Sequence, residues 1–306
     1  MGFIGSRLVA SPSASVSASV SASSAPTVPT SVGSKQDENT ATMPFTTIRD
    51  LFKVINHTDG DLLIVTHVSP SCFIEIERER EKRRHKFRFR RYDSDRQILF
   101  ITIPTRLHEA LHVGIYEGFR DQLVISGRKN SWGTIGATTF RAEHGHPGGD
   151  SGEGDSTGGP KPERGMKNDW PTLVIEAGVS ESLAGLRNDI RWWFSTSDHQ
   201  VQIVLLIKFE HTRRAITLEK WEEATSSTRP GATTTRIAAA LQPVLRQTIT
   251  IIQDTTTNPV SYNVTRGALV LGFRLLFLRD PGPGEGDFVL SVQELEDYAK
   301  GVWETV

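Results

Sequence analysis

Glu176 is the residue whose position is hardest to explain by packing alone. It stands in the run "PTLVIEAG" (171–178), which contains no other polar side chain except Thr172 and predicts a buried strand. Burying an unpaired carboxylate is costly in free energy. A glutamate here is therefore a candidate metal ligand or catalytic group, unless it points outward or pairs with an arginine. Because ligands collect at the carboxyl ends of strands in α/β sheets, the end of this strand favours a site.

A second candidate is the run "HEALH" (108–112). His108 and His112 are four residues apart, so a helix would present both imidazoles on one face. With Glu109 between them, the run matches H-E-x-x-H, the zinc-binding helix of metalloproteases. The sequence shows no separate third ligand, so a zinc metalloprotease is a minor alternative.

A serine nucleophile is a third candidate. Ser180 lies in "AGVSES" (177–182), at an expected strand–turn–helix junction. Ser182 replaces the second glycine of G-x-S-x-G, and the required histidine would have to be His199 or His211, both very close in sequence. The pattern therefore disfavours a serine hydrolase.

Composition limits the classes of protein to consider. The chain has 306 residues, a net charge of −1 and one cysteine, Cys72. This charge argues against nucleic-acid coating by bulk charge, and the single cysteine excludes an intrachain disulfide framework and any cysteine-rich zinc site. No apolar run reaches the 18 or so residues that a membrane span needs. We expect a soluble intracellular protein, nuclear or cytoplasmic.

Composition also divides the chain into segments. Residues 1–45 are rich in serine and alanine and predict a disordered tail, 46–223 an α/β domain, and 224–306 a linker with an extension packed on that domain. The stretch 75–91 alternates in charge and ends in a basic cluster, Lys82–Arg91. Such a run is usually a solvated face, but Arg88 and Arg90 alternate with two phenylalanines, so this side of a strand could face nucleic acid.

Periodicity predicts a mixed α/β (α+β) fold, a mixed central sheet flanked by helices. Helices are expected from Leu107 and from about Ser182. Residues 142–169 are rich in glycine and proline and predict an irregular loop. Strands are expected at 96–103, 122–126, 134–140, 171–178 and 201–209, with an edge strand at 215–222.

The run "DWPTLVIEAGVSESLAGLRNDIRWWF", with "VQIVLLIKFE" and "ITLEKWE", resembles filamentous-fungal proteins related to the PD-(D/E)XK restriction-endonuclease-like superfamily, and more distantly its Uma2-like bacterial branch. The resemblance covers about residues 90–223, and more loosely 246–251 and 275–303. It implies a nuclease-like fold in which acids from two successive strands hold a divalent cation, Mg²⁺ or Mn²⁺.

Carried over residue by residue, the resemblance makes Glu176 the second acid. The first acid falls on Asp155, with Asp150 and Asp169 as rivals, and an acid from the first helix falls on Glu109. The lysine expected two residues after the second acid is missing, because Gly178 stands there. The next helix offers Arg187 or Arg191, which could hold a phosphate but cannot act as a base.

Two classes of function follow. The first is a metal-dependent phosphodiesterase acting on nucleic acid through Asp155, Glu176 and Glu109, with Arg187 as the catalytic cation. The second is a nuclease-like fold without catalysis that serves as a binding or scaffold module. The lost lysine and the near-neutral charge favour the second class, and the carboxylate in an apolar strand favours the first.

Residues 1 to about 42 lack a packable face, so we expect protease to remove them before it cuts the rest of the chain. Limited trypsin or subtilisin digestion followed by mass spectrometry measures this order of cleavage. Cuts within 46–223 that precede removal of the tail would contradict the expectation.

Overall fold

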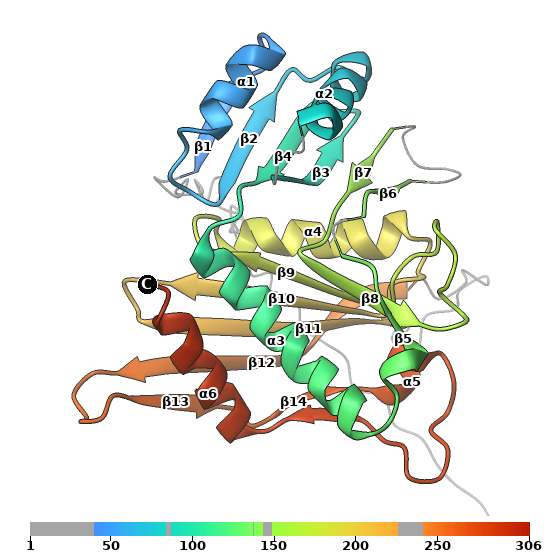
Figure 1. The fold of residues 1–306 in the computed structure, drawn as a ribbon, viewed down its shortest axis with the longest axis vertical. Coiled ribbons are helices and arrows are strands. Elements are labelled where there is room, and N and C mark those ends of the chain that lie inside the picture. The colour runs from blue at the N-terminus through green and yellow to red at the C-terminus, as the bar shows by residue number, and fades with distance from the viewer. Residues whose placement is uncertain (1–39, 84–86, 137, 143–148, 226–240) are drawn as a thin grey trace, which may run out of the picture. The chain divides into compact units, whose positions relative to one another are not determined.

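The computed structural model describes residues 40–306 except 84–86, 137, 143–148 and 226–240. They belong to one compact unit, Asp37–Val306, built from three β-sheets and their covering helices (Figure 1). The predicted disordered tail lies outside the described residues up to residue 39. Its last part does not match the expectation, because Ala41–Pro44 forms strand β1.

The largest sheet has seven strands and carries Glu176. Its order is β13-β12-β11-β10-β9-β8-β5, with β9 and β10 parallel and the other neighbours antiparallel. The strands are β5 (Trp132–Thr134), β8 (Ser156–Pro160), β9 (Leu173–Gly178), β10 (Ile203–Glu210), β11 (Ala215–Thr225), β12 (Leu241–Asp254) and β13 (Ser261–Thr265). The predicted mixed sheet, with 171–178 beside 201–209, is confirmed.

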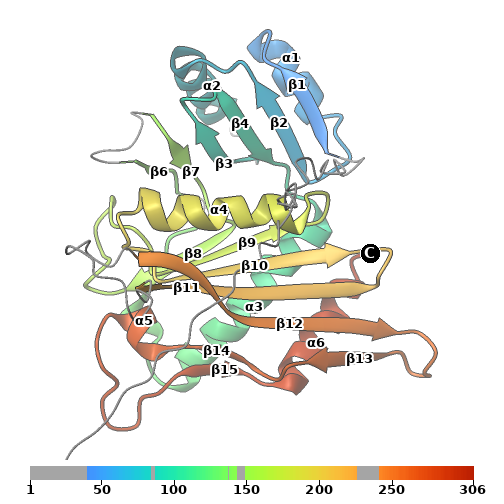
Figure 2. The ribbon, with the colours of Figure 1, turned by 180° about the vertical axis from the view of Figure 1, so that it is seen from behind.

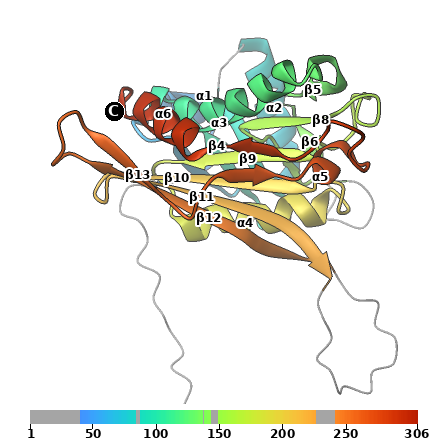
Figure 3. The same cartoon turned by 90° about the horizontal axis from the view of Figure 1, so that it is seen from below.

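Helices cover both faces of this sheet. Helix α3 (Arg106–Ile125) and helix α6 (Val292–Trp303) lie on one face and α4 (Leu183–Thr196) on the other, as Figures 2 and 3 show from two directions. Side chains alternate between the two faces of β9 in agreement with this arrangement. The odd-numbered Leu173, Ile175 and Ala177 pack in the hydrophobic core that contains α3, and Val174 packs in the core that contains α4. Glu176, an even-numbered position, therefore points toward α4.

A six-stranded sheet is built mainly from residues that precede the large sheet in the chain, with β6 and β7 added from between β5 and β8. Its order is β1-β2-β4-β3-β7-β6, and helices α1 and α2 pack on it. The elements not yet given are α1 (Ile48–Ile55), β2 (Leu62–Thr66), α2 (Pro70–Arg83), β3 (Arg88–Asp93), β4 (Ile98–Thr102), β6 (Phe140–Arg141) and β7 (Ser151–Gly152). Because β7 is followed directly by β8, this segment joins the two sheets next to Asp155.

The C-terminal segment completes the unit. Strands β14 (Leu269–Leu271) and β15 (Phe288–Leu290) form a two-stranded sheet, and the short helix α5 (Phe273–Phe277) lies between them in sequence. Side chains of all three, and of α6, pack in the same core as α3. No described helix combines the length and apolarity that crossing a membrane would require.

Strand β8 corrects the prediction of an irregular loop over 142–169. All five residues of "STGGP" are buried, and the strand pairs with β5 and β9. Its glycines reflect close packing: a Cβ on Gly158 would lie 2.5 Å from Nε1 of Trp132 and 2.6 Å from the hydroxyl of Tyr116. Glycine here marks close approach inside a strand, which composition alone does not distinguish from a loop.

Three further expectations about strands were wrong. Residues 122–125 form the end of helix α3 and Ser126 caps it; the buried face of the helix continues through Phe119 and Leu123. Of the described residues within 134–140, which leave out 137, only the two ends are in strands, β5 and β6. Strand β11 is not an edge strand, because β12, from the segment after the expected linker, pairs with it from Thr225 back to Ala215.

The packing at Gly158 predicts a large penalty for one added methyl group. Gly158→Ala should lower the free energy of unfolding by about 1–3 kcal/mol, since the side chains of Trp132 and Tyr116 must move. Urea unfolding measures the change. Gly301→Ala is the control, because no atom lies within 4 Å of the added carbon and the helix α6 should gain stability. Equal midpoints for wild type and Gly158→Ala would contradict the close packing.

Candidate metal centre

Two buried carboxylates lie where β8 and β9 run side by side. Asp155 immediately precedes β8, and Ser156 pairs with Ile175 of β9, the residue before Glu176. Asp155 is 5% exposed and Glu176 is 0% exposed. The backbone N–H of Ala177 donates to Oδ2 of Asp155 at 2.9 Å, so Asp155 is held against the end of β9.

Glu176 has one well-made hydrogen bond and one unsatisfied oxygen. Nε1 of Trp193 on α4 donates to Oε1 at 2.7 Å. Oε2 has no hydrogen-bond partner among the described residues and lies 4.0 Å from Nε of Arg90. Burial, reinforced by the charge of Asp155, raises the pKa of Glu176 well above its usual range despite the opposing effect of Arg90. A proton or a nearby cation is thus required to keep this side chain buried.

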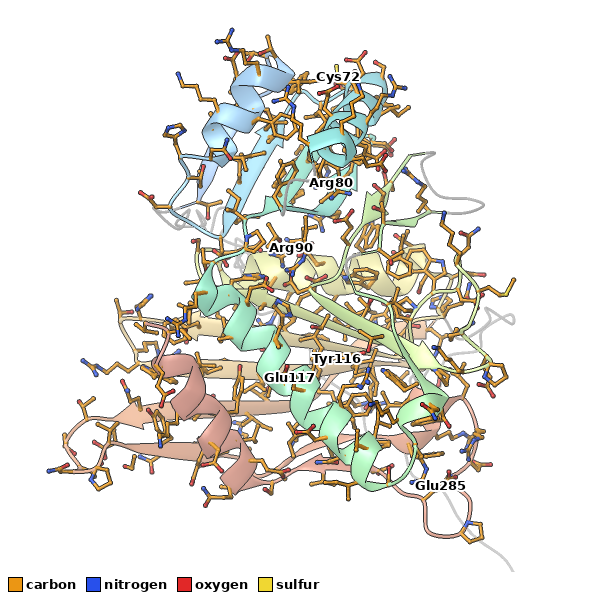
Figure 4. All side chains as sticks on the ribbon, in the orientation of Figure 1. Cys72, Arg80, Arg90, Tyr116, Glu117 and Glu285 are labelled. Carbon is orange, nitrogen blue, oxygen red and sulfur yellow. The ribbon has the colours of Figure 1, made fainter. Side chains whose placement is uncertain are left out.

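Arg90 is the cation that the fold itself supplies on this side. It is 3% exposed and forms ion pairs of 2.6 Å with Glu181 and with Asp189, and Figure 4 shows it between the six-stranded sheet and α4. A shift in the β3–β4 register places Phe89 opposite Ile101 and Arg91 opposite Phe100. Arg90 is the extra residue of this irregularity, which is why its side chain turns inward.

Asp155 contacts a buried histidine on the α3 side. Nε2 of His108 lies 3.1 Å from Oδ1 of Asp155, and Nδ1 lies 3.1 Å from Oδ2 of Asp61. Although burial alone would lower it, the two aspartates raise the pKa of His108 to about 10. Burial alone would raise the pKa of Asp155, but His108, His112 and Arg88 hold it well below its usual range.

Glu109 and His112 join this group from α3. Nδ1 of His112 lies 2.8 Å from Oγ of Ser156, and Nε2 lies 3.3 Å from Oε1 of Glu109. Arg88 connects Glu109 to Asp155, with Nη2 at 2.9 Å from Oε1 of Glu109 and Nη1 at 3.1 Å from Oδ1 of Asp155. The three side chains His108, His112 and Asp155 offer ligand atoms that all lie within 4.8 Å of one another.

The rival first acids have other partners. Asp150 accepts from the backbone N–H and hydroxyl of Ser94, and Asp169 accepts from the backbone N–H of Met166. Of the three aspartates that the resemblance allows, Asp155 is the one held against β9.

Arg187 points to a different group. Its Nε donates to Oε2 of Glu219 on β11 at 3.0 Å, and its side chain is 44% exposed. The described contacts therefore do not join Arg187 to Asp155 or Glu176. Lys208 of β10 lies beside the missing position, because it pairs with Gly178, and its Nζ donates to the carbonyl of Val179 at 2.6 Å.

The interpretation of Lys82–Arg91 as a surface facing nucleic acid is corrected for its last part. Arg88, Arg90 and Arg91 are 14%, 3% and 13% exposed, and their charges are paired with carboxylates. Lys82 and Arg83 are exposed and pair with Glu79. The alternation with phenylalanine correctly indicated a strand, but the polar side of that strand is covered.

Sequence reasoning missed Asp61. The backbone N–H groups of Val179 and Ser180 donate to its two oxygens at 2.7 and 2.8 Å, so it fixes the loop after β9 as well as His108. A cavity of about 320 Å³ lies beside it, with Ser180 and His211 also in its wall. Oγ of Ser180 accepts from the backbone N–H of Asp61 at 3.4 Å. Nothing in the sequence around Asp61 distinguishes it from an ordinary turn residue.

No protein-family model matches the chain, and no curated protein matches it. Among solved structures it is similar to a protein of Anabaena variabilis described as "a putative nuclease belonging to DUF820". The identity is 12% and the TM-score 0.37, over 68% of this chain and 90% of that one.

Glu181 predicts how stability depends on pH. Burial outweighs Arg90 and raises its pKa from 4.5 to about 7, so the folded protein retains a proton that the unfolded chain loses. The resulting stability is complete below pH 4.5 and is lost as pH rises through about 7, with a slope of at most about 1.4 kcal/mol per pH unit. Glu181→Gln cannot ionise, so its stability should fall less than that of wild type from pH 5 to 7.5. Urea unfolding at each pH tests this, and parallel curves for the two proteins would contradict it.

Proposed function

We propose that the chain is a metal-dependent, nuclease-like phosphodiesterase of the PD-(D/E)XK type, in which Asp155 and Glu176 hold Mg²⁺ or Mn²⁺. The observation that carries the proposal is the unsatisfied Oε2 of the fully buried Glu176, together with Asp155, a second buried carboxylate that directly precedes the neighbouring strand β8 and whose charge acts on Glu176. Such a pair favours a hard divalent cation, which takes oxygen ligands.

The fit of a cation to these residues rests on charge. Asp155 raises the pKa of Glu176, and Arg90 at 4.0 Å from Oε2 offsets this effect only in part. A divalent cation would favour both ionised carboxylates. When bound, it would supply Lewis-acid chemistry for hydrolysis of a phosphodiester.

Glu109 would be a further metal ligand, and cations of the chain would bind and orient the substrate. Glu109 is the third acid that the resemblance implies, and Arg88 joins it to Asp155. Arg187 was the expected catalytic cation, and its ion pair with Glu219 speaks against that role. Lys208, registered beside Gly178, is the alternative cation. Nucleic acid is the proposed substrate class.

One observation favours the alternative, a nuclease-like fold without catalysis. Arg88 contacts Asp155 directly and Arg90 lies near Glu176, so cations of the chain already compensate both acids. In a binding or scaffold module, the arginines would compensate the two carboxylates permanently, with no metal bound. The two functions differ in whether added metal changes the protein.

Metal-dependent stability distinguishes these functions. At about 100 times its dissociation constant, Mn²⁺ should raise the free energy of unfolding by about 2.7 kcal/mol, or the melting temperature by roughly 5–10 °C. Glu176→Gln preserves the shape and removes the charge, so it should abolish this gain while leaving the stability of the metal-free protein similar or higher. Thermal melts with and without Mn²⁺ measure both quantities.

Glu219→Gln is the matched control, because Glu219 is buried as Glu176 is, accepts a hydrogen bond from a tryptophan as Glu176 does, and likewise lies beside an arginine. It should retain the full Mn²⁺ effect. Equal Mn²⁺ shifts in wild type and Glu176→Gln would show that Glu176 is structural. A shift specific to Glu176 without cleavage of single- or double-stranded DNA or RNA would favour the binding module.

A further inference from the structure

We propose that His108, His112 and Asp155 form a binding site for a divalent transition metal, with Zn²⁺ as the preferred ion. The site shares Asp155 with the proposed phosphodiesterase centre but uses nitrogen ligands from α3 in place of Glu176. It does not depend on the proposed function.

The two histidines could act as ligands through Nε2, because Nδ1 of each ring already has a partner. They are one helical turn apart on α3 and are 1% and 2% exposed. Nδ1 of His108 contacts Asp61, and Nδ1 of His112 contacts Ser156. Both Nε2 atoms are buried, and neither makes a hydrogen bond with any residue that the structure describes. Nε2 of His108 faces Asp155 at 3.1 Å and Nε2 of His112 faces Glu109 at 3.3 Å. Both nitrogens are thus directed at carboxylates, and a metal ion bound there would replace the proton that His108 otherwise holds.

Asp155 supplies the third ligand that the run "HEALH" lacks in sequence. Its oxygen and the two histidine nitrogens lie within 4.8 Å of one another. Nε2 of His108 is 3.1 Å from Oδ1 of Asp155, yet the two atoms are not aligned for a hydrogen bond. A tetrahedral zinc ion with bonds of about 2.0–2.1 Å separates its ligand atoms by roughly 3.4 Å. The His108–Asp155 pair has nearly this spacing, and a closure of at most about 1.4 Å would bring the other pairs of ligand atoms, which lie within 4.8 Å of one another, to it.

The residues behind the histidines fit a metal site as well. Asp61 is fixed by the backbone N–H groups of Val179 and Ser180, and it contacts the far nitrogen of His108. Ser156, held in β8, contacts the far nitrogen of His112. Partners of this kind set the orientation and tautomer of metal-bound histidines.

The charges around the site balance with a divalent ion. Asp61, Glu109 and Asp155 carry three negative charges, Arg88 carries one positive charge and the ion two, giving zero with both histidines neutral. Glu109, at 3.3 Å from Nε2 of His112 and 38% exposed, is the most solvent-exposed of these four charged side chains. Two imidazoles and one carboxylate favour Zn²⁺ over Mg²⁺, which prefers oxygen ligands and retains water.

The test uses the full chain and two metals. Zn²⁺ is titrated by isothermal calorimetry, and Co²⁺, which substitutes for it, is followed by its visible absorption. Wild type should bind one equivalent tightly. His112→Asn removes Nε2 but keeps an amide that can reach Ser156, and it should weaken Zn²⁺ binding by more than the roughly 10- to 100-fold effect of losing an outer partner. His199→Asn, at an exposed histidine that pairs with Glu223, is the matched control and should bind as wild type does.

Ser156→Ala keeps all three ligands and tests the site without removing one. It should weaken Zn²⁺ binding about 10- to 100-fold, with the circular dichroism spectrum unchanged. Glu176→Gln should retain the Zn²⁺ affinity and the Co²⁺ spectrum even if it loses the Mn²⁺ effect, so failure of the phosphodiesterase proposal and failure of this one give different results.

Two outcomes would overturn the proposal. Wild type that binds no Zn²⁺ would mean that His108 serves as a cationic partner of Asp61 and Asp155. Zn²⁺ affinity that is the same in wild type, His112→Asn and Ser156→Ala would place the bound metal elsewhere in the chain.

Discussion

Compensation of buried negative charge is the constraint on which the centre of this protein depends. Asp155 and Glu176 lie in the interior of the seven-stranded sheet, where an isolated ionised carboxylate would be strongly destabilising. Cations reach them from other elements: Arg88 and Arg90 from β3, and His108 from α3. Substituting any of these cations would leave a carboxylate to be protonated or exposed. The six-stranded sheet is therefore coupled electrostatically to the large one.

The same constraint explains local irregularities in the backbone. The register shift in β3 turns Arg90 inward toward Glu181 and Asp189, where a regular strand would alternate its side chains. Strand β8 approaches α3 so closely that a glycine is required at position 158. This approach holds Ser156 against His112 and Asp155 against His108. Close packing and charge compensation are thus two aspects of one arrangement.

The two proposed metal sites share Asp155 and differ in the chemistry of their other ligands. One adds Glu176, which faces α4, and offers oxygen ligands; the other adds two imidazoles from α3 and offers nitrogen ligands. Hard cations such as Mg²⁺ suit the first and borderline cations such as Zn²⁺ the second. Arg88 contacts Asp155 and Glu109, so its position would influence both.

The amino-acid sequence by itself determined the features that depend on residues close together in the chain. These are the mixed α/β class, the buried strand that carries Glu176, the strand that lies beside it, and the helical spacing of His108 and His112. Periodicity is sufficient for these, because it reports which side of an element is apolar. The resemblance favoured Asp155 as the first acid but left Asp150 and Asp169 as rivals.

Only the tertiary structure decided which charged groups meet. Asp61 is 47 residues from His108, its partner, and Arg90 is 91 residues from Glu181, so no local pattern relates them. The glycine-rich β8 and the inward-facing arginines of β3 were read from composition as a loop and an exposed face. Composition reports how well a residue is solvated on average, whereas a buried arginine or a packed glycine is fixed by the particular partner that the fold brings to it.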